Sequence, residues 1–385
     1  MIMTRREFIY SCGAVGAGAA FCVPLTVVAG NQQTSDSYAV AVLGDTHYDA
    51  EPESVYHLHY DVSKRNAKTH RKEFVRNGEM WRERCPSMIS ASAALAAKTP
   101  TRFILQLGDI IQGDCDDVPT HKKMLDDCIK MLRKPYPASL PFLTVMGNHD
   151  FRGKGARRAY LDFAMSYMTG EIASLTGKNP EAVKYPAFSF RCGRDVWVFC
   201  DFETVKGLES VCKLIEGAHD ARHVFLVTHG PFTASVMTGL PFWRLAGSKA
   251  CDAMRHRLYE ALSRRRAVVL SGHTHTTSFY RFENKWGGFA EATVNSVWNR
   301  QETATAAPIH CGLEQYAPNF KNVRKKDREA YANQVEFFKG SLSEYFCGEG
   351  AGHYRLDVSD DGVKLSFYPG AAEKAAKVFA LKKGS

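Results

Sequence analysis

The sequence predicts a layered α/β domain, and three observations support this fold class. Short apolar runs rich in β-branched and aromatic residues alternate with segments of helical periodicity, which is typical of sheets covered by helices. Polar clusters directly follow five of the apolar runs. In open α/β sheets, ligands gather beyond the carboxyl ends of the strands, so we expect the five clusters to converge at one edge.

The apolar runs are predicted to be buried strands. Five of them precede the polar clusters: 38–43, 103–107, 142–146, 224–227 and 267–270. Residues 187–200 read as a strand pair that turns at Cys192-Gly193-Arg194. Near the C-terminus, Asp361-Gly362 separates residues 354–358 from 363–368, which predicts a second hairpin.

Helical periodicity is clear in three segments. Residues 88–97 stop before Thr99-Pro100, where a helix is expected to end. Residues 120–133 place five apolar side chains on one face, and a third helix is predicted around residues 208–215. The apolar residues are Met124, Leu125, Cys128, Ile129 and Leu132 in the second helix, and Leu208, Val211, Cys212 and Ile215 in the third.

Five polar clusters carry the chemistry. They read Asp45-Thr-His47, Gly108-Asp109-Ile-Ile-Gln112, Gly147-Asn148-His149-Asp150, Thr228-His229-Gly-Pro231 and Gly272-His273-Thr-His275. Each alone is weak evidence, but chance rarely produces all five in this order. Two metal ions about 3.5–4 Å apart need carboxylate, amide and imidazole donors from several directions and one shared carboxylate, for which Asp109 is the natural bridge. Such a pair suits phosphoryl transfer.

The clusters resemble the motifs of the calcineurin-like metallophosphoesterase family, which read Asp-x-His, Gly-Asp-x-x, Gly-Asn-His-Asp or -Glu, a later His, and Gly-His-x-His. The resemblance implies a four-layer α/β/β/α sandwich with two facing mixed sheets and the metals at the strand carboxyl ends. It also implies two divalent or trivalent ions of Mn, Fe or Zn. One ion would be held by Asp45, His47, Asp109 and His275, and the other by Asp109, Asn148, His229 and His273.

The same resemblance assigns two catalytic residues. His149 would stabilise the transition state or protonate the leaving oxygen, and Asp150 would orient its ring. Asn148 and Arg152 are candidate substrate contacts, because an Arg fork can clamp a phosphate oxygen, although a surface Arg in a turn explains Arg152 equally well.

The residues at positions 47 and 112 distinguish this chain from one branch of the family. Purple acid phosphatases place a Tyr ligand three residues after the bridging Asp and a Gly at the position of His47, whereas this chain has Gln112 and His47. The chain therefore resembles the Asp-x-His type, which includes phosphodiesterases, nucleases and nucleotide pyrophosphohydrolases as well as monoesterases. Gln112 also replaces the Asp or Asn that is common there.

We therefore expect a phosphoric ester hydrolase that uses in-line attack of a metal-bridging hydroxide on a small phosphodiester, nucleotide or other phosphorylated metabolite. A phosphomonoesterase or nuclease of the same fold, or a non-catalytic metal-binding scaffold, remains the alternative.

The formal charge of +9 is moderate, with one concentration of basic residues between Lys64 and Arg84. Because no row of aromatics is interleaved with these cations, no specific nucleic-acid partner is expected. The oligomeric state is left open.

The N-terminus suggests export. Residues 4–9, Thr-Arg-Arg-Glu-Phe-Ile, precede a Gly- and Ala-rich stretch, so residues 1–30 resemble a twin-arginine signal peptide. Cleavage would release a periplasmic or secreted protein with no stable membrane anchor, whereas an uncleaved segment would anchor it. The predicted organisation then comprises a core at 36–298 with a cover at 48–85, a second cover at 299–352, and a hairpin and tail at 353–385.

The eleven cysteines include two, Cys12 and Cys22, in the predicted signal. The remaining nine form no Cys-x-x-Cys pair, so we expect mostly buried thiols rather than a disulfide framework. Examples are Cys128, Cys200, Cys212 and Cys251.

Overall fold

The computed structural model describes residues 37–49, 53–59, 67–178, 183, 187–200, 205–234, 249–297, 308–320, 323–348 and 350–384. They all belong to one unit, Asp36–Ser385. The predicted signal peptide lies outside the described residues.

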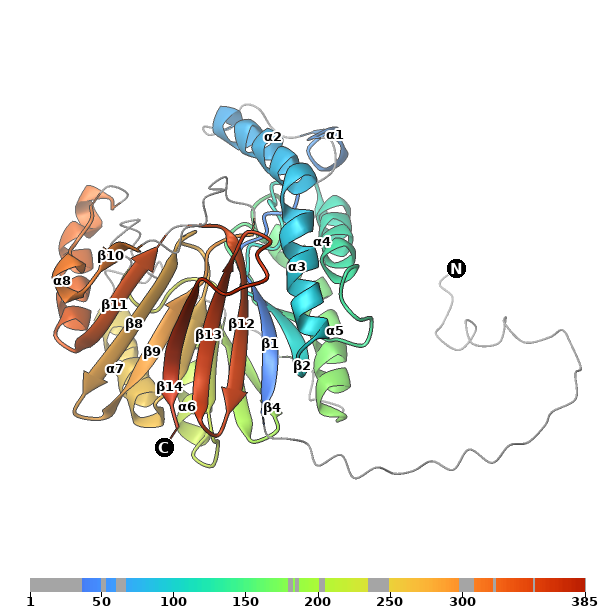
Figure 1. Cartoon of the computed structure of the whole chain (residues 1–385). Helices are drawn as coiled ribbons and strands as arrows, with labels where there is room; N and C mark the ends of the chain where they lie inside the picture. Colours follow the sequence, from blue (N-terminus) through green and yellow to red (C-terminus); the bar gives the residue numbers. More distant parts are fainter. Residues whose placement is uncertain are drawn as a thin grey trace, which may run out of the picture. The chain divides into compact units, whose positions relative to one another are not determined.

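The first sheet has six strands in the order β14-β13-β12-β1-β2-β3. β1 pairs in parallel with β2, and β2 with β3, whereas β12 runs antiparallel to β1. The sheet is therefore mixed, with parallel strands on one side and an antiparallel meander on the other (Figure 1). Its strands are β1 (Tyr38–Leu43), β2 (Thr101–Gln106), β3 (Phe142–Thr144), β12 (Gly352–Ser359), β13 (Gly362–Pro369) and β14 (Lys377–Lys383).

The second sheet has eight strands in the order β10-β11-β8-β9-β7-β6-β5-β4. Its central strands β5, β6, β7 and β9 run parallel to one another. β4 pairs antiparallel with β5, and β8 pairs antiparallel with β9. The strands are β4 (Ala187–Cys192), β5 (Asp195–Cys200), β6 (Val224–Thr228), β7 (Val268–Ser271), β8 (Thr277–Asn284), β9 (Gly287–Thr293), β10 (Pro308–Cys311) and β11 (Leu342–Gly348).

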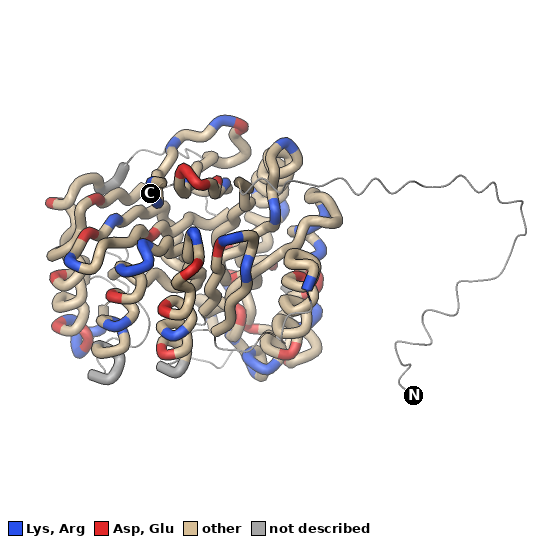
Figure 2. Tube along the Cα trace, turned by 90° about the horizontal axis from the view of Figure 1, so that it is seen from below, with Lys and Arg blue, Asp and Glu red and all other residues tan. Residues whose placement is uncertain are grey.

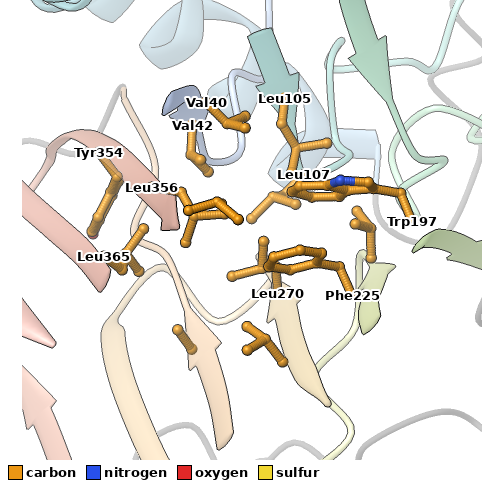
Figure 3. Packing of buried hydrophobic residues seen from close by; sticks show 14 of the residues in the cluster. Val40, Val42, Leu105, Leu107, Trp197, Phe225, Leu270, Tyr354, Leu356 and Leu365 are labelled. Atoms are coloured by element: carbon orange, nitrogen blue, oxygen red, sulfur yellow. The ribbon is translucent and has the colours of Figure 1, made fainter. Parts of the chain in front are cut away.

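The two sheets pack against each other through a continuous apolar layer. Figure 3 shows part of it, with Val40 and Leu105 from the first sheet close to Trp197 and Phe225 from the second. The ring of Phe103 meets that of Trp197 edge-on across the interface, with the centroids 5.0 Å apart. Burying each such side chain contributes about 1.5–3 kcal/mol, so this layer is a major source of stability.

Helices cover the outer face of each sheet and complete four layers. α3 (Cys85–Ala97), α4 (Val118–Arg133) and α5 (Ala156–Thr176) pack on the first sheet, and α6 (Val205–Gly217) and α7 (Lys249–Arg265) on the second. Along β1, Val40 and Val42 face the other sheet while Ala41 and Leu43 face the helices. Both faces of the strand are buried, which explains its continuous apolar run. The predicted α/β fold with two mixed sheets is confirmed.

The remaining helices lie outside these layers. α1 (Glu53–Tyr56) and α2 (Ala67–Glu83) belong to the segment predicted to be a cover at 48–85, and α8 (Arg328–Lys339) packs against the second sheet. Two 3₁₀ turns, Leu313–Gln315 and Lys325–Asp327, precede α8.

The predicted strands and hairpins are present, with their ends shifted by one or two residues in most cases. The segment 299–352 differs from the expected cover, because its described part contains β10 and β11, which extend the second sheet beyond β8. β11 has no regular alternation of buried and exposed residues, so periodicity alone does not distinguish it from a loop.

A buried carboxylate links the two sheets by hydrogen bonds at the end where β1 and β5 begin. Asp195, at the start of β5, has no exposed surface and accepts four hydrogen bonds. Arg222 donates through Nε at 2.9 Å and Nη2 at 2.6 Å, the Tyr38 hydroxyl donates from β1 at 2.9 Å, and the His223 N–H donates at 3.1 Å. Arg222 also bonds Asp360, in the turn between β12 and β13, at 3.0 Å. We refer to these five residues as the Asp195 cluster.

Lys and Arg are interspersed with Asp and Glu along the chain in the view of Figure 2. Within the described part of the chain, no helix has the length and apolarity needed to cross a bilayer.

The eight cysteines whose side chains are described are all free thiols, and seven of them are buried.

Candidate metal centre

The five polar clusters converge where the carboxyl ends of strands from both sheets meet. Asp45, Asp109 and Asn148 follow β1, β2 and β3 of the first sheet, whereas His229 follows β6 and His273 follows β7 of the second. Three overlapping groups of side chains could hold a metal, and the ligand atoms of each group lie within 4.8 Å of one another. The groups are Asp45, His47 and His275; His47, Asp109 and His149; and Asp109, His229 and His273.

One side of the centre is formed by Asp45, His47 and His275. The Nε2 atom of His275 lies 2.8 Å from Oδ2 of Asp45 and 3.1 Å from Nε2 of His47. Nε2 of His47 is in turn 3.7 Å from Oδ2 of Asp109. The three side chains thus present a carboxylate and two imidazoles to one position, beside Asp109.

The other side is formed around His229. Its Nε2 atom lies 3.3 Å from Oδ2 of Asp109, 3.2 Å from Oδ1 of Asn148 and 3.1 Å from Nδ1 of His273. Oδ2 of Asp109 therefore faces both groups, which is the position of a bridging ligand. All seven residues predicted to bind metal are brought together.

Backbone groups orient these side chains. Nδ1 of His229 lies 2.8 Å from the Leu107 carbonyl and donates to it, which turns Nε2 toward Asp109. The carboxylate of Asp45 accepts the N–H of His273 at 3.0 Å, and Oδ1 of Asp109 accepts the N–H of His149 at 2.7 Å. The second oxygen of Asp109 is left for the centre.

The electrostatics of the cluster favour a bound cation. Burial lowers the pKa of His229, but the charges of Asp109 and Asp45 outweigh burial and raise it to about 9. Burial and the neighbouring His229 lower the pKa of His273 to about 4. The carboxylates thus attract positive charge. Because the imidazoles lie close together, they cannot all be protonated, and a metal cation can supply the remaining charge. Two carboxylates, an amide and imidazoles form a donor set that suits Mn, Fe or Zn.

Four of the candidate ligands have a left-handed backbone. The φ angles are 41° for His47, 50° for Asp109, 71° for His273 and 52° for His275. Within the described residues only Asp114 and Arg266 share this feature among non-glycine residues. Such conformations cost about 1 kcal/mol or more each and concentrate at functional sites, because the surrounding structure must enforce them.

Two glycines of the motifs are required by close packing. A Cβ atom at Gly272 would collide with the carboxylate of Asp45, and one at Gly147 would collide with the backbone and carboxylate of Asp109. These positions accept only glycine because the ligand loops approach one another so closely.

Asp150 differs from its predicted role. Its carboxylate is buried and accepts the N–H of Gly147 at 2.7 Å and of Ile111 at 3.2 Å, so both carboxylate oxygens bond to backbone and not to the ring of His149. Burial, with the charge of Asp109, raises the pKa of Asp150 to about 8. Asp150 therefore joins the loops after β2 and β3 instead of orienting the imidazole, because it points back into the turn.

Gln112 and Arg152, and not Asp150, place polar atoms within hydrogen-bond distance of the ring of His149. Nδ1 lies 3.1 Å from the carbonyl oxygen of Gln112, to which it can donate. Nη1 of Arg152 lies 2.8 Å from Nδ1 and 2.9 Å from Nε2, so the guanidinium rests against the ring. Nη2 of Arg152 bonds Asp114 at 2.5 Å and Glu73 at 3.2 Å. Two carboxylates thus already engage the guanidinium that the sequence suggested as a phosphate clamp.

Helix α2 supplies side chains that the sequence analysis does not identify. Gln112 donates from Nε2 to Glu73 at 3.0 Å, and its Oε1 accepts from Asn77. The indole of Trp81 donates to the carbonyl of Thr46, between two candidate ligands, at 2.7 Å. Apolar residues spaced along this segment, including Phe74 and Trp81, could have indicated the helix but not its docking site.

Comparisons with known proteins agree with this arrangement. The model of the family described as calcineurin-like phosphoesterase matches residues 38–277. No curated protein sequence matches the chain.

Several solved structures are similar to this chain at low sequence identity, and one of them, with a TM-score above 0.5, supports the fold. A purple acid phosphatase from yellow lupin (Lupinus luteus) seeds is 11% identical with a TM-score of 0.52, covering 91% of this chain and 54% of that one. A dimetal phosphatase from Danio rerio is 11% identical with a TM-score of 0.48, covering 90% and 99%. The anchor GAP50 of the inner membrane complex of Plasmodium is 14% identical with a TM-score of 0.46, covering 91% and 90%.

Proposed function

Because the chain belongs to the calcineurin-like phosphoesterase family, we propose that it is an exported dinuclear-metal phosphoesterase that hydrolyses a small phosphate ester, with a phosphodiester or nucleotide as the leading substrate class. The observation that carries this proposal is the position of Asp109, whose Oδ2 atom faces His47 at 3.7 Å on one side and His229 at 3.3 Å on the other. One shared carboxylate between two groups of ligands is what a two-metal site requires.

Each residue has a distinct part in this reaction. When bound, two metal ions activate a water molecule for in-line attack and neutralise charge on the phosphoryl oxygens. Asn148, which lies against His229, can donate from its amide to a phosphoryl oxygen. In this proposal His149, held by Gln112 and Arg152, stabilises or protonates the oxygen that leaves.

A small substrate is supported by the position of α2. This helix contacts the loops at Thr46, Gln112 and Arg152, so it restricts the approach to the centre on that side. A long nucleic-acid strand would need an open groove lined by basic residues.

Metal replacement tests the proposed activity. Protein stripped of metal and then loaded with Mn, Zn or Fe is expected to hydrolyse bis(p-nitrophenyl) phosphate or p-nitrophenyl phosphate, whereas the stripped protein is not, because the nucleophile depends on the metals. Initial rates of nitrophenolate release, paired with metal analysis, provide the measurement. If no loaded form hydrolyses any phosphate ester, the proposal fails.

Export is the second part of the proposal and is supported by residues 4–9. We expect replacement of Arg5 and Arg6 by Lys to retain the protein in the cytoplasm of its native host, because the signal depends on the arginine pair. Cell fractionation with immunoblotting measures this. Unchanged location of the variant, or a cytoplasmic location of the wild type, would refute export.

A further inference from the structure

One face of α2 is docked on the loops of the metal centre. Glu73, Asn77 and Trp81 are spaced four residues apart, so they lie on the same side of the helix. Through the bonds described above, this face reaches three loops: the loop after β1 at Thr46, the loop after β2 at Gln112, and the loop after β3 at Arg152. Figure 1 shows that α2 continues directly into α3 of the helical layer.

Glu73 accepts hydrogen bonds from both Gln112 and Arg152, the two residues whose polar atoms lie within hydrogen-bond distance of the ring of His149. Its Oε2 atom accepts from Nε2 of Gln112 at 3.0 Å and from Nη2 of Arg152 at 3.2 Å. Gln112 in turn presents its backbone carbonyl to Nδ1 of His149, and Arg152 rests its other nitrogen against the ring. One oxygen of Glu73 therefore fixes the positions of both residues that bond to the imidazole of His149.

The charges explain why a carboxylate is needed at this position. Arg152 is only 20% exposed and has a second partner in Asp114, which is 8% exposed. Asp114 and Glu73 both accept from Nη2, whose two hydrogens lie in the plane of the guanidinium, so a second carboxylate is needed to fix that plane against His149. Glu73, at 26% exposure, supplies that carboxylate from a different element.

The unusual residue at position 112 fits the same arrangement. An Asp carboxylate could not donate to Glu73, and the amide of Asn is one methylene shorter, whereas Gln112 both donates to Glu73 and accepts from Asn77. The side chain that departs from the common family pattern is thus the one that connects the helix to the loop beside His149.

We propose that Glu73 is a positioning residue for His149, acting through Gln112 and Arg152, and that α2 is consequently a part of the catalytic apparatus and not only a cover. The inference rests on the proposed function, since it concerns the residue that acts on the leaving oxygen. Glu73 belongs to none of the three groups of candidate metal ligands, so its effect on His149 passes through Gln112 and Arg152.

The test compares Glu73→Gln with Glu83→Gln in metal-loaded protein. Both variants remove one negative charge from α2, but Glu83 is exposed at the end of the helix. Glu73→Gln is expected to lower kcat about tenfold, the scale of such supporting contacts, with KM changed less than about twofold and metal content unchanged. Glu83→Gln is expected to match the wild type.

A series of leaving groups separates positioning from a general structural effect. Because His149 acts on the departing oxygen, the loss in Glu73→Gln should be larger for an alkyl phosphate ester than for a nitrophenyl ester, whose leaving group needs little assistance. Adding Arg152→Lys to Glu73→Gln should cost less than Arg152→Lys costs alone, because the two residues act along one path.

Any one of three defects in Glu73→Gln would show that the residue does not position His149. They are an equal loss for all leaving groups, a rise in KM at constant kcat, and a loss of bound metal in Glu73→Gln. A wild-type protein that hydrolyses no phosphate ester in any metal-loaded form would overturn the proposed function, and the inference with it. Active wild-type protein with a fully active Glu73→Gln variant would overturn the inference alone.

Discussion

Asp109→Asn is expected to abolish most metal-dependent hydrolysis, lowering kcat by about 10³-fold. The bridging role requires an anionic oxygen that both metals can share, and the neutral amide removes it while keeping the shape of the side chain. Losing about 4 kcal/mol of charge stabilisation corresponds to this factor. The Asn carbonyl oxygen can still accept the N–H of His149, now bonded to Oδ1 of Asp109 at 2.7 Å, so the loop is expected to stay folded.

The measurement combines initial rates on a nitrophenyl ester with metal analysis of the same sample. Metal content should fall below the wild-type level as rates fall, while the circular dichroism spectrum and the melting temperature of the metal-free proteins remain close. Asp126→Asn is a suitable control, because Asp126 is exposed on α4 and forms a surface ion pair with Lys130 in the neighbouring turn. Full activity in Asp109→Asn would exclude the bridging role of Asp109.

Asp195→Ala is expected to reduce the free energy of unfolding by about 3–5 kcal/mol while leaving the metal centre intact. The change removes the acceptor of four hydrogen bonds and leaves Arg222, whose side chain is 9% exposed, without its buried partner. Removing one member of a buried ion pair costs this amount because the other charge stays desolvated.

Urea denaturation of the metal-free proteins gives the free energy of unfolding directly. Asp360→Ala provides the control, since its carboxylate is 65% exposed and bonds the same Arg222, so a loss of at most about 1 kcal/mol is expected. Equal destabilisation by the two variants would show that burial of Asp195 does not govern the strength of the cluster. Each variant should retain wild-type kcat when folded and loaded with metal.

Much of the layered core follows from local sequence patterns. The five apolar runs are strands, and the residues after them converge because the carboxyl ends of parallel strands share an edge. This is why Asp45, Asp109 and His229 could be placed in one site from residue order alone. The hairpin at Asp361-Gly362 likewise depends on a local turn preference.

Other features depend on contacts between distant residues and could not be predicted in this way. Glu73 and Arg152 are 79 positions apart, and their pairing requires knowing where α2 docks. The direction in which the carboxylate of Asp150 points is decided by the turn that contains it, which the motif Gly-Asn-His-Asp does not specify. For Asp195, the sequence gives no sign that a charged residue at the start of a strand would be completely buried.

The placement of the ligands on both sheets has a thermodynamic consequence. Because Asp45 and Asp109 come from the first sheet and His229 and His273 from the second, metal ions bound among them would cross-link the two halves of the sandwich at one rim. The Asp195 cluster joins the same halves at the opposite end. Loading the site would then add its binding free energy to the cohesion of the sheets, since unfolded chains lack the assembled site. In the metal-free protein this rim is linked by hydrogen bonds such as those from His273 to Asp45 and from His229 to Leu107, so we expect the sheets to separate there more readily than in the metal-loaded protein.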